Sequence, residues 1–271
     1  FVPFAFTVLG LLGEEKQRAL TIPVVVLQTV AANLGSMLTP IGNPQNLYLY
    51  TKFSIPNLEF MGIMAPPFIL SVTLITLCCI IFVKSEPMKI EGETAKLPPL
   101  RTTLYLLLFA LSIAIVFRGI PYVIGLIVIP AVLIFADRKA LKMVDYPLLL
   151  TFVFFFIFSG NMARIEVVRN FLSSLMEKST LLFSVLSCQF ISNVPSAILL
   201  SQFTENYREL LLGVNIGGVG TLIASLASLI TFKEYSKQDP GHTLRYILKF
   251  SAYNFAFLII LIIVCSIAKA V

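Results

Sequence analysis

The 271-residue sequence contains no tryptophan and few charged residues. Asp, Glu, Lys and Arg together make up 13% of it, whereas a soluble domain has about 25%. Hydrophobic residues make up 58%, and the mean hydropathy is +0.92. This composition excludes a water-soluble domain and predicts an integral membrane protein. Without tryptophan, its interfacial aromatic belt has to come from tyrosine.

Residues that bind metals or carry out catalysis are equally scarce. The only histidine is His242, and the four cysteines (Cys78, Cys79, Cys188 and Cys265) all lie inside apolar runs. The cysteines are therefore interpreted as small buried residues, which excludes a disulfide framework and a structural zinc site. No nucleophile–base pair or phosphate loop is present, and Asp and Glu stand at or near predicted loops. We predict neither an enzyme nor a cofactor.

Apolar runs of membrane-spanning length recur along the chain. A helix needs ~20 apolar residues to cross the hydrocarbon core. A partial run opens the chain at 1–12, clean or nearly clean runs occupy 60–83, 102–117, 120–136, 147–160 and 244–268, and interrupted runs occupy 20–50, 181–203 and 210–232. The sequence thus predicts an all-α, polytopic transmembrane protein.

Two of the interrupted runs share a pattern. The segments 33–47 and 215–229 both read N-x-G-x-x-x-T-x-I-x-x-x-x-x-L when they are aligned without gaps. They are also the two most polar stretches within apolar runs. A pair of hydrophobic segments broken by Gly or Pro at corresponding positions is typical of the binding site of a transporter built from inverted repeats.

Physical chemistry explains why such breaks indicate a binding site. An unpaired backbone group in lipid costs several kcal/mol, so irregular backbone persists only where it lines a cavity or binds something. Pro40 and Pro44 remove donors, and glycines such as Gly42 and Gly218 permit unwinding. Freed carbonyls can coordinate a small cation, and a half-helix N-terminus can hold an anion. Neutral hydrogen-bonding side chains accompany the breaks: Thr39, Asn43, Gln45, Asn46 and Thr221.

A third polar interruption, 189–196, divides the run 181–203 into two arms. Each arm is too short to cross a membrane alone, and Pro195 follows the polar pair Ser192 and Asn193. The favoured interpretation is a re-entrant hairpin with its tip at this pair. The alternative is one spanning helix whose polar residues contact another helix.

Charge distribution predicts the topology. The net charge is +6, but the basic residues stand in short connectors between apolar runs, so we expect no nucleic acid as a partner. If the hairpin re-enters and the other runs cross, most of the 20 Lys and Arg residues lie on one side, which is then cytoplasmic. The mixed-charge connector 84–101 falls on that side. The segment 164–178 fits either an amphipathic interfacial helix or a polar linker helix.

The first broken run carries a family resemblance. The stretch Thr39-Pro-Ile-Gly-Asn-Pro-Gln-Asn46, with the residues that precede it, resembles the signature of the ion transporter superfamily, which includes citrate transporters, divalent anion:sodium symporters and arsenite permeases. The Ser192-Asn193-Val194-Pro195 stretch is similar to the second hairpin motif of that superfamily, and 215–225 is similar to its second unwound helix.

The resemblance implies a fold and a set of site residues. It implies two inverted repeats, each with a re-entrant hairpin and a broken helix, with 1–83 as the end of the first, 84–101 as a cytoplasmic linker and 102–271 as the second. The first hairpin tip would precede Phe1, so we expect this chain to lack it. By position, the first site would comprise Thr39, Gly42, Asn43 and Asn46, and the second Ser192, Asn193, Asn215, Gly218 and Thr221. Elevator-like movement and a homodimer in the lipid bilayer are implied as well.

The function predicted on this basis is secondary active transport of a small anion in the plasma membrane. A di- or tricarboxylate such as citrate, coupled to Na⁺ or H⁺, is the leading substrate class. Val194 stands where the symporter motif has a threonine hydroxyl, and Asn43 stands where some arsenite permeases have an acid. Efflux of arsenite or antimonite is the alternative substrate class. A channel and a membrane-embedded enzyme are the alternatives from other classes.

Overall fold

The computed structural model describes residues 2–83 and 98–270, with side chains up to residue 267. In chain order the α-helices are α1 (Val2–Leu9), α2 (Glu14–Gly35), α3 (Pro44–Lys52), α4 (Asn57–Phe82), α5 (Pro99–Val116), α6 (Tyr122–Ala136), α7 (Arg138–Lys142), α8 (Tyr146–Met162), α9 (Glu166–Ile191), α10 (Asn193–Leu200), α11 (Tyr207–Ile216), α12 (Leu226–Gln238) and α13 (Thr243–Ala270). Two short 3₁₀ helices, η1 (Leu222–Ala224) and η2 (Pro240–His242), flank α12. Over the described ranges there is no strand, which confirms the all-α class.

Several of these helices have the length and composition of membrane spans. Within the described residues, α2, α4, α5 and α13 each qualify, and the pair α8 and α9, bent by 98°, makes a fifth if it counts as one span. Hydrophobic side chains remain exposed along them, for example Ile80 on α4 and Ile259 on α13. Such apolar outer surfaces fit a lipid solvent, and the fold is that of a polytopic membrane protein.

The chain divides into two compact units. One comprises residues 1–88 and 155–271, and the other comprises 89–154. In the second unit, α5 packs on α6, and Arg101 and Tyr105 both bind the Asp137 carboxylate, each at 2.7 Å. The hydroxyl of Tyr105 and the charge of Arg101 hold the pKa of Asp137 below its usual value.

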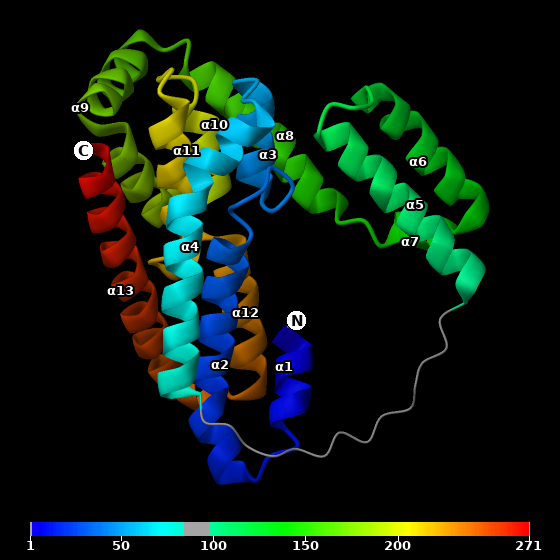
Figure 1. Ribbon diagram of the computed structural model, residues 1–271, viewed down its shortest axis with the longest axis vertical. Coiled ribbons are helices and arrows are strands. Elements are labelled where there is room, and N and C mark those ends of the chain that lie inside the picture. The colour runs from blue at the N-terminus through cyan, green and yellow to red at the C-terminus, as the bar shows by residue number, and fades with distance from the viewer. Residues whose placement is uncertain (1, 84–97, 271) are drawn as a thin grey trace. The chain divides into compact units, whose positions relative to one another are not determined.

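In the first unit the two broken helices run in opposite directions. Figure 1 shows α2 rising to the first break and continuing as α3, while α11 descends to the second break and continues as α12. α2 packs against α4, α12 and α13, whereas α3 packs against α10 and α11. Both breaks therefore lie at the junction between the same two groups of helices.

Local sequence explains where the broken helices stop and restart. α2 begins with the acidic pair Glu14 and Glu15, which suits the positive end of a helix dipole. α3 restarts with Pro44 at its first position after Asn43, and α12 restarts after Ser225, whose hydroxyl accepts from the Ser228 amide at 3.2 Å. Proline thus sets the restart of α3, and a serine cap sets the restart of α12.

The third interruption is a helical hairpin. α9 has non-helical backbone at Ser179, so its first part, to Lys178, forms the helix predicted over 164–178. Its second part and α10 pack against each other and meet at Ser192, where φ is +72°. The hydroxyls of Ser187 and Ser196 join the two arms at 2.9 Å. The hairpin, rather than one continuous helix, is therefore the structure of 181–203.

The predicted repeat boundaries remain predictions, because compact units defined by contacts do not test them. Of the predicted cytoplasmic linker 84–101, residues 84–97 lie outside the described part of the chain, and its last residues begin α5. The interfacial position of 164–178 also remains a prediction.

Candidate functional site

The first break spans residues 36–43, and a buried asparagine from α3 occupies it. The side chain of Asn46 is 0% exposed, and its Nδ2 donates to the carbonyls of Met37 at 3.2 Å and Thr39 at 3.3 Å. Both carbonyls belong to the non-helical segment that follows α2, and the Thr39 carbonyl also accepts from the Gly42 amide at 3.1 Å. The side-chain amide thus replaces the missing turn of backbone hydrogen bonds.

Asn43 and Gly42 close the other side of this break. The Oδ1 of Asn43 accepts from the Ser36 hydroxyl at 2.8 Å, and its Nδ2 donates to the Asn33 carbonyl at 3.3 Å. Gly42 lies against the Ser36 carbonyl so closely that a Cβ would overlap its oxygen. Glycine is therefore required here for close approach of two backbone segments.

The second break, between α11 and α12, is occupied by a glutamine from the hairpin. Nε2 of Gln189 donates to the carbonyls of Gly217 at 3.0 Å and Val219 at 3.2 Å. Its Oε1 accepts from the Thr221 amide at 2.8 Å, and the Thr221 hydroxyl donates to the Gln189 carbonyl at 3.0 Å. The hairpin and the unwound segment are therefore joined through one side chain.

The hairpin tip lies against the same break. The Ser192 hydroxyl donates to the Ala224 carbonyl at 3.4 Å, which is a long contact. Asn193 is 6% exposed, and its Nδ2 lies 3.0 Å from where a Cβ on Gly218 would be. The Oδ1 of Asn193 accepts from the amide of the next residue, Val194, at 2.9 Å.

The two breaks are linked by the asparagines that open the shared sequence pattern. Asn215, in α11, is 1% exposed and donates to Oδ1 of Asn46 at 2.7 Å. Asn33, in α2, donates to the Gly218 carbonyl at 3.2 Å and to the Ser225 hydroxyl at 2.9 Å. Asn33 thus contacts the break of the other run, and Asn215 contacts the asparagine that occupies the first break.

We refer to these side chains as the break network. Its members are Asn33, Ser36, Asn43, Gln45, Asn46, Gln189, Ser192, Asn215, Thr221, Ser225 and Ser228. Five of the predicted site residues belong to it: Asn43, Asn46, Ser192, Asn215 and Thr221. Thr39, Gly42 and Gly218 contact its members through backbone groups, and Asn193 lies against Gly218. Their assignment to substrate or ion stays a prediction.

Some members were not among the predicted site residues: Asn33, Ser36, Gln45, Gln189, Ser225 and Ser228. The sequence does indicate Asn33, because this residue occupies the same place in the shared pattern as the predicted site residue Asn215. Ser225 likewise occupies the place of Asn43. For Gln189 the only indication in the sequence is its position in the polar interruption 189–196. That position does not show that its side chain enters the break between two other helices.

The network is neutral and surrounded by apolar residues. All of its members carry amides or hydroxyls, and none is ionisable at neutral pH. Buried apolar side chains such as Leu34, Val185 and Val214 pack around it. Across the described residues, no group of three or more His, Cys, Asp or Glu could hold a metal ion. Hydrogen bonds and helix dipoles therefore dominate its electrostatics, and low polarity nearby strengthens both.

Helix ends add a directional component to this field. α3 begins after Asn43, α10 after Ser192 and α12 after Ser225, so three helix N-termini start within the network. Each N-terminus has a partial positive charge. The arrangement favours a small anion, and the carbonyls freed at the breaks favour a cation.

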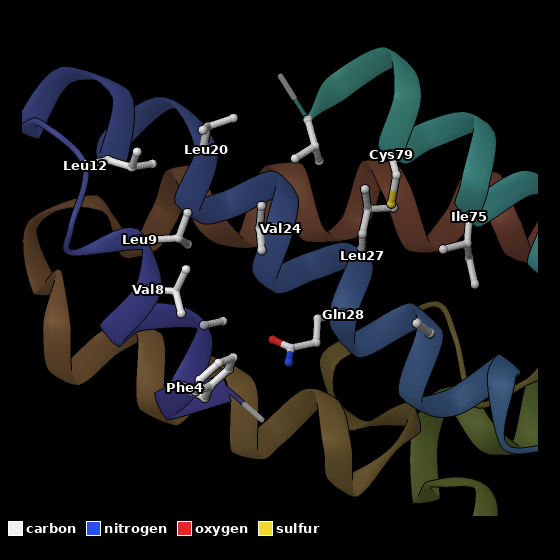
Figure 2. Close-up of a pocket in the computed structure, with 13 residues that line it drawn as sticks. Phe4, Val8, Leu9, Leu12, Leu20, Val24, Leu27, Gln28, Ile75 and Cys79 are labelled. Atoms are coloured by element: carbon white, nitrogen blue, oxygen red, sulfur yellow. The ribbon is translucent and has the colours of Figure 1, made fainter. Parts of the chain in front are cut away.

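A separate pocket lies between α1, α2 and α4 and differs in character. It has a volume of about 470 Å³, and its walls are largely apolar, including Phe4, Leu20, Leu27 and Ile75. Figure 2 shows Gln28 as the polar side chain among them, and within the described part of the chain the Oε1 of Gln28 has no hydrogen-bond partner. A pocket without convergent polar groups is not suited to a small charged substrate.

Comparison with known protein sequences identifies the family. The sequence profile described as citrate transporter matches residues 1–207. The chain belongs to the citrate transporter family. This confirms, at the level of the family, the resemblance to the ion transporter superfamily. The profile covers α1 to α10, which includes the first break and the hairpin.

This citrate transporter family chain has two similar relatives, one named as a transporter and the other as an inner membrane protein. An uncharacterized transporter of Methanocaldococcus jannaschii is 38% identical over 211 residues, which are 78% of this chain and 57% of that protein. The inner membrane protein YbiR of Escherichia coli K12 is 32% identical over 226 residues, 80% of this chain and 60% of that protein. The chain spans less than two thirds of the length of either relative. It is an integral membrane protein of a transporter family.

Proposed function

We propose that the protein is a secondary active transporter of small anions, with di- and tricarboxylates such as citrate as its substrates. The observation that carries the proposal is the convergence of three helix N-termini on a partly buried, neutral network of amides and hydroxyls. Carboxylate oxygens accept hydrogen bonds from such donors, and the helix dipoles favour their charge. The family to which the chain belongs supports the same substrate class.

The driving force proposed is a cation gradient, Na⁺ or H⁺, across the plasma membrane. The first break supports a role for Na⁺, because Ser36, Thr39 and Asn43 are only half-buried and offer hydroxyl, carbonyl and amide oxygens. Oxygens of this kind are suitable ligands for a hard cation. No acid belongs to the network in the described residues, so a coupling proton would have to bind elsewhere.

Replacing Asn193 with alanine is expected to abolish citrate uptake while the protein still folds. Asn193 is buried at the hairpin tip, but its one hydrogen bond described here is local, to the adjacent amide. Losing a local side-chain bond costs only about 0.5–2 kcal/mol, by analogy with helix caps. The measurement is uptake of labelled citrate into proteoliposomes, with thermal unfolding of the same samples.

Asn206→Ala is the matched control. Asn206 also makes a local bond, to the Glu209 amide at 3.2 Å, but it lies at the other end of α11 from the break. It should lose similar stability and keep its uptake. If Asn193→Ala transports at the rate of Asn206→Ala, the hairpin tip does not contribute to the substrate site.

A further inference from the structure

The Gln189 side chain has an unusual number of acceptors around one nitrogen. Its Nε2 lies within 3.2 Å of three backbone carbonyls, those of Val185, Gly217 and Val219. An amide NH₂ carries only two hydrogens, so three acceptors share two donors. The orientation of the amide follows from its partners, because Oε1 accepts from the Thr221 N–H at 2.8 Å and a flipped amide would place two donors together.

Three carbonyls that converge on one point form the kind of site that attracts a cation. Carbonyl oxygens carry partial negative charge, and two of these three belong to the unwound segment between α11 and α12. In apolar surroundings their mutual repulsion has to be offset by a positive partner. The partner present here is the positive end of a side-chain dipole.

The two breaks differ in how closed they are. In the second break Gly217, Gly218, Val219 and Gly220 are all buried. Gly220 has φ +124° and lies so close to Gln189 that a Cβ would overlap its Oε1. In the first break Ile41 and Gly42 are exposed. The side-chain amide of Asn46 there donates to two carbonyls, one for each of its two hydrogens. The part of the second break that lies against Gln189, residues 217–220, is therefore buried, whereas Thr221 and Leu222 beyond it are half-buried and Ile223 is exposed.

We infer that Gln189 is a positioning residue whose carboxamide takes the place of a cation in the second break. It neutralises the carbonyls freed there, fixes the hairpin to the unwound segment, and makes this half of the site independent of a bound ion. The inference rests on the proposed function, since it assigns the coupling cation to the first break alone. The transporter would then couple to fewer cations than one with an ion in each break.

Two substitutions at Gln189 test the inference, because each should make the stability of the second break depend on a bound cation. Gln189→Ala removes the amide and leaves space beside the carbonyls of Gly217 and Val219. Gln189→Glu places a carboxylate against them, which a bound Na⁺ can bridge. Gln238→Glu is the control, because Gln238 is exposed at the end of α12.

The measurement is the Tm of the purified full-length protein in detergent, in Na⁺ and in choline at equal ionic strength. We expect both Gln189 variants to be less stable than wild type in choline. We also expect Na⁺ to raise their Tm by about 5–10 °C more than it raises that of wild type or Gln238→Glu, when Na⁺ exceeds its Kd about a hundredfold. Should Gln189→Glu fail to fold, Gln189→Ala gives the same comparison.

The inference is overturned if Na⁺ shifts the Tm of every variant by the same amount. It is also overturned if the Gln189 variants are as stable as wild type in choline. This readout does not depend on transport. Absence of citrate uptake by wild type would contradict the proposed function while leaving the Tm comparison valid. Equal Tm shifts in all variants would contradict the role of Gln189 while leaving the proposed function untouched.

Discussion

Gly42→Ala is expected to lower the initial rate of transport about 100-fold or more, whereas Gly35→Ala should leave the rate close to that of wild type. A Cβ on Gly42 would overlap the Ser36 carbonyl oxygen, so the first break would have to open. Displacing binding groups by about 1 Å can cost a factor of about 100 in rate. Uptake of labelled substrate, normalised to folded protein, is the measurement.

Gly35 provides the control because it lies at the same break but has room for a Cβ atom. It is the last residue of α2, it is exposed, and nothing lies within 4 Å of where its Cβ would be. Alanine should favour the helix there by roughly 0.5–1 kcal/mol. Equal transport by the two alanine variants would show that the close approach at Gly42 is not needed for function.

The second large effect concerns Asn46 and Asn215, which together link the two breaks. Alanine at Asn46 leaves the Met37 and Thr39 carbonyls without this donor, and alanine at Asn215 removes the donor to Asn46. The Thr39 carbonyl keeps its bond from the Gly42 amide, so the main cost comes from the Met37 carbonyl and from the asparagine that loses its partner. We expect each variant to lower the free energy of unfolding by about 1–3 kcal/mol. Transport should be lost in both variants, since both breaks depend on this contact.

A double-mutant cycle tests whether the pair acts as a unit. Because the two side chains bond directly at 2.7 Å, the double variant should be less destabilised than the sum of the singles, with a coupling energy of about 0.5–3 kcal/mol. Denaturant unfolding supplies the numbers, and Asn161→Ala, at an exposed site near the end of α8, is the control. Strict additivity would mean that the two breaks are not coupled through these asparagines.

The positions of the breaks and of the hairpin could be predicted from the sequence because they depend on residues close together in the chain. Proline and glycine limit which residues continue a helix, so Pro44 and Gly42 identify the first break directly. Ser192 and Asn193, placed between two short apolar arms, identify the hairpin in the same way. The shared pattern also relates the two breaks, and the structure links them directly through the Asn46–Asn215 bond. That the two breaks form one binding site stays a prediction.

The contacts across the network could not be predicted, because they join residues far apart in the sequence. Asn33 reaches Gly218 across 185 positions, and Gln189 enters a break that lies beyond α10 and α11. Nothing local to Gln189 indicates its partner. The sequence predicted that the freed carbonyls could bind a cation, but it could not show that side-chain amides already bond to several of them.

Transport itself is the most direct test of the central claim. The measurement is labelled-citrate uptake into proteoliposomes that contain the full-length protein, first with an inward Na⁺ gradient and then with a pH gradient of matched driving force. We expect saturable uptake under one of the two gradients, and the effective gradient would identify the coupling ion. No uptake under either gradient by protein shown to be folded would contradict a carboxylate symporter and would favour oxyanion efflux on the same fold.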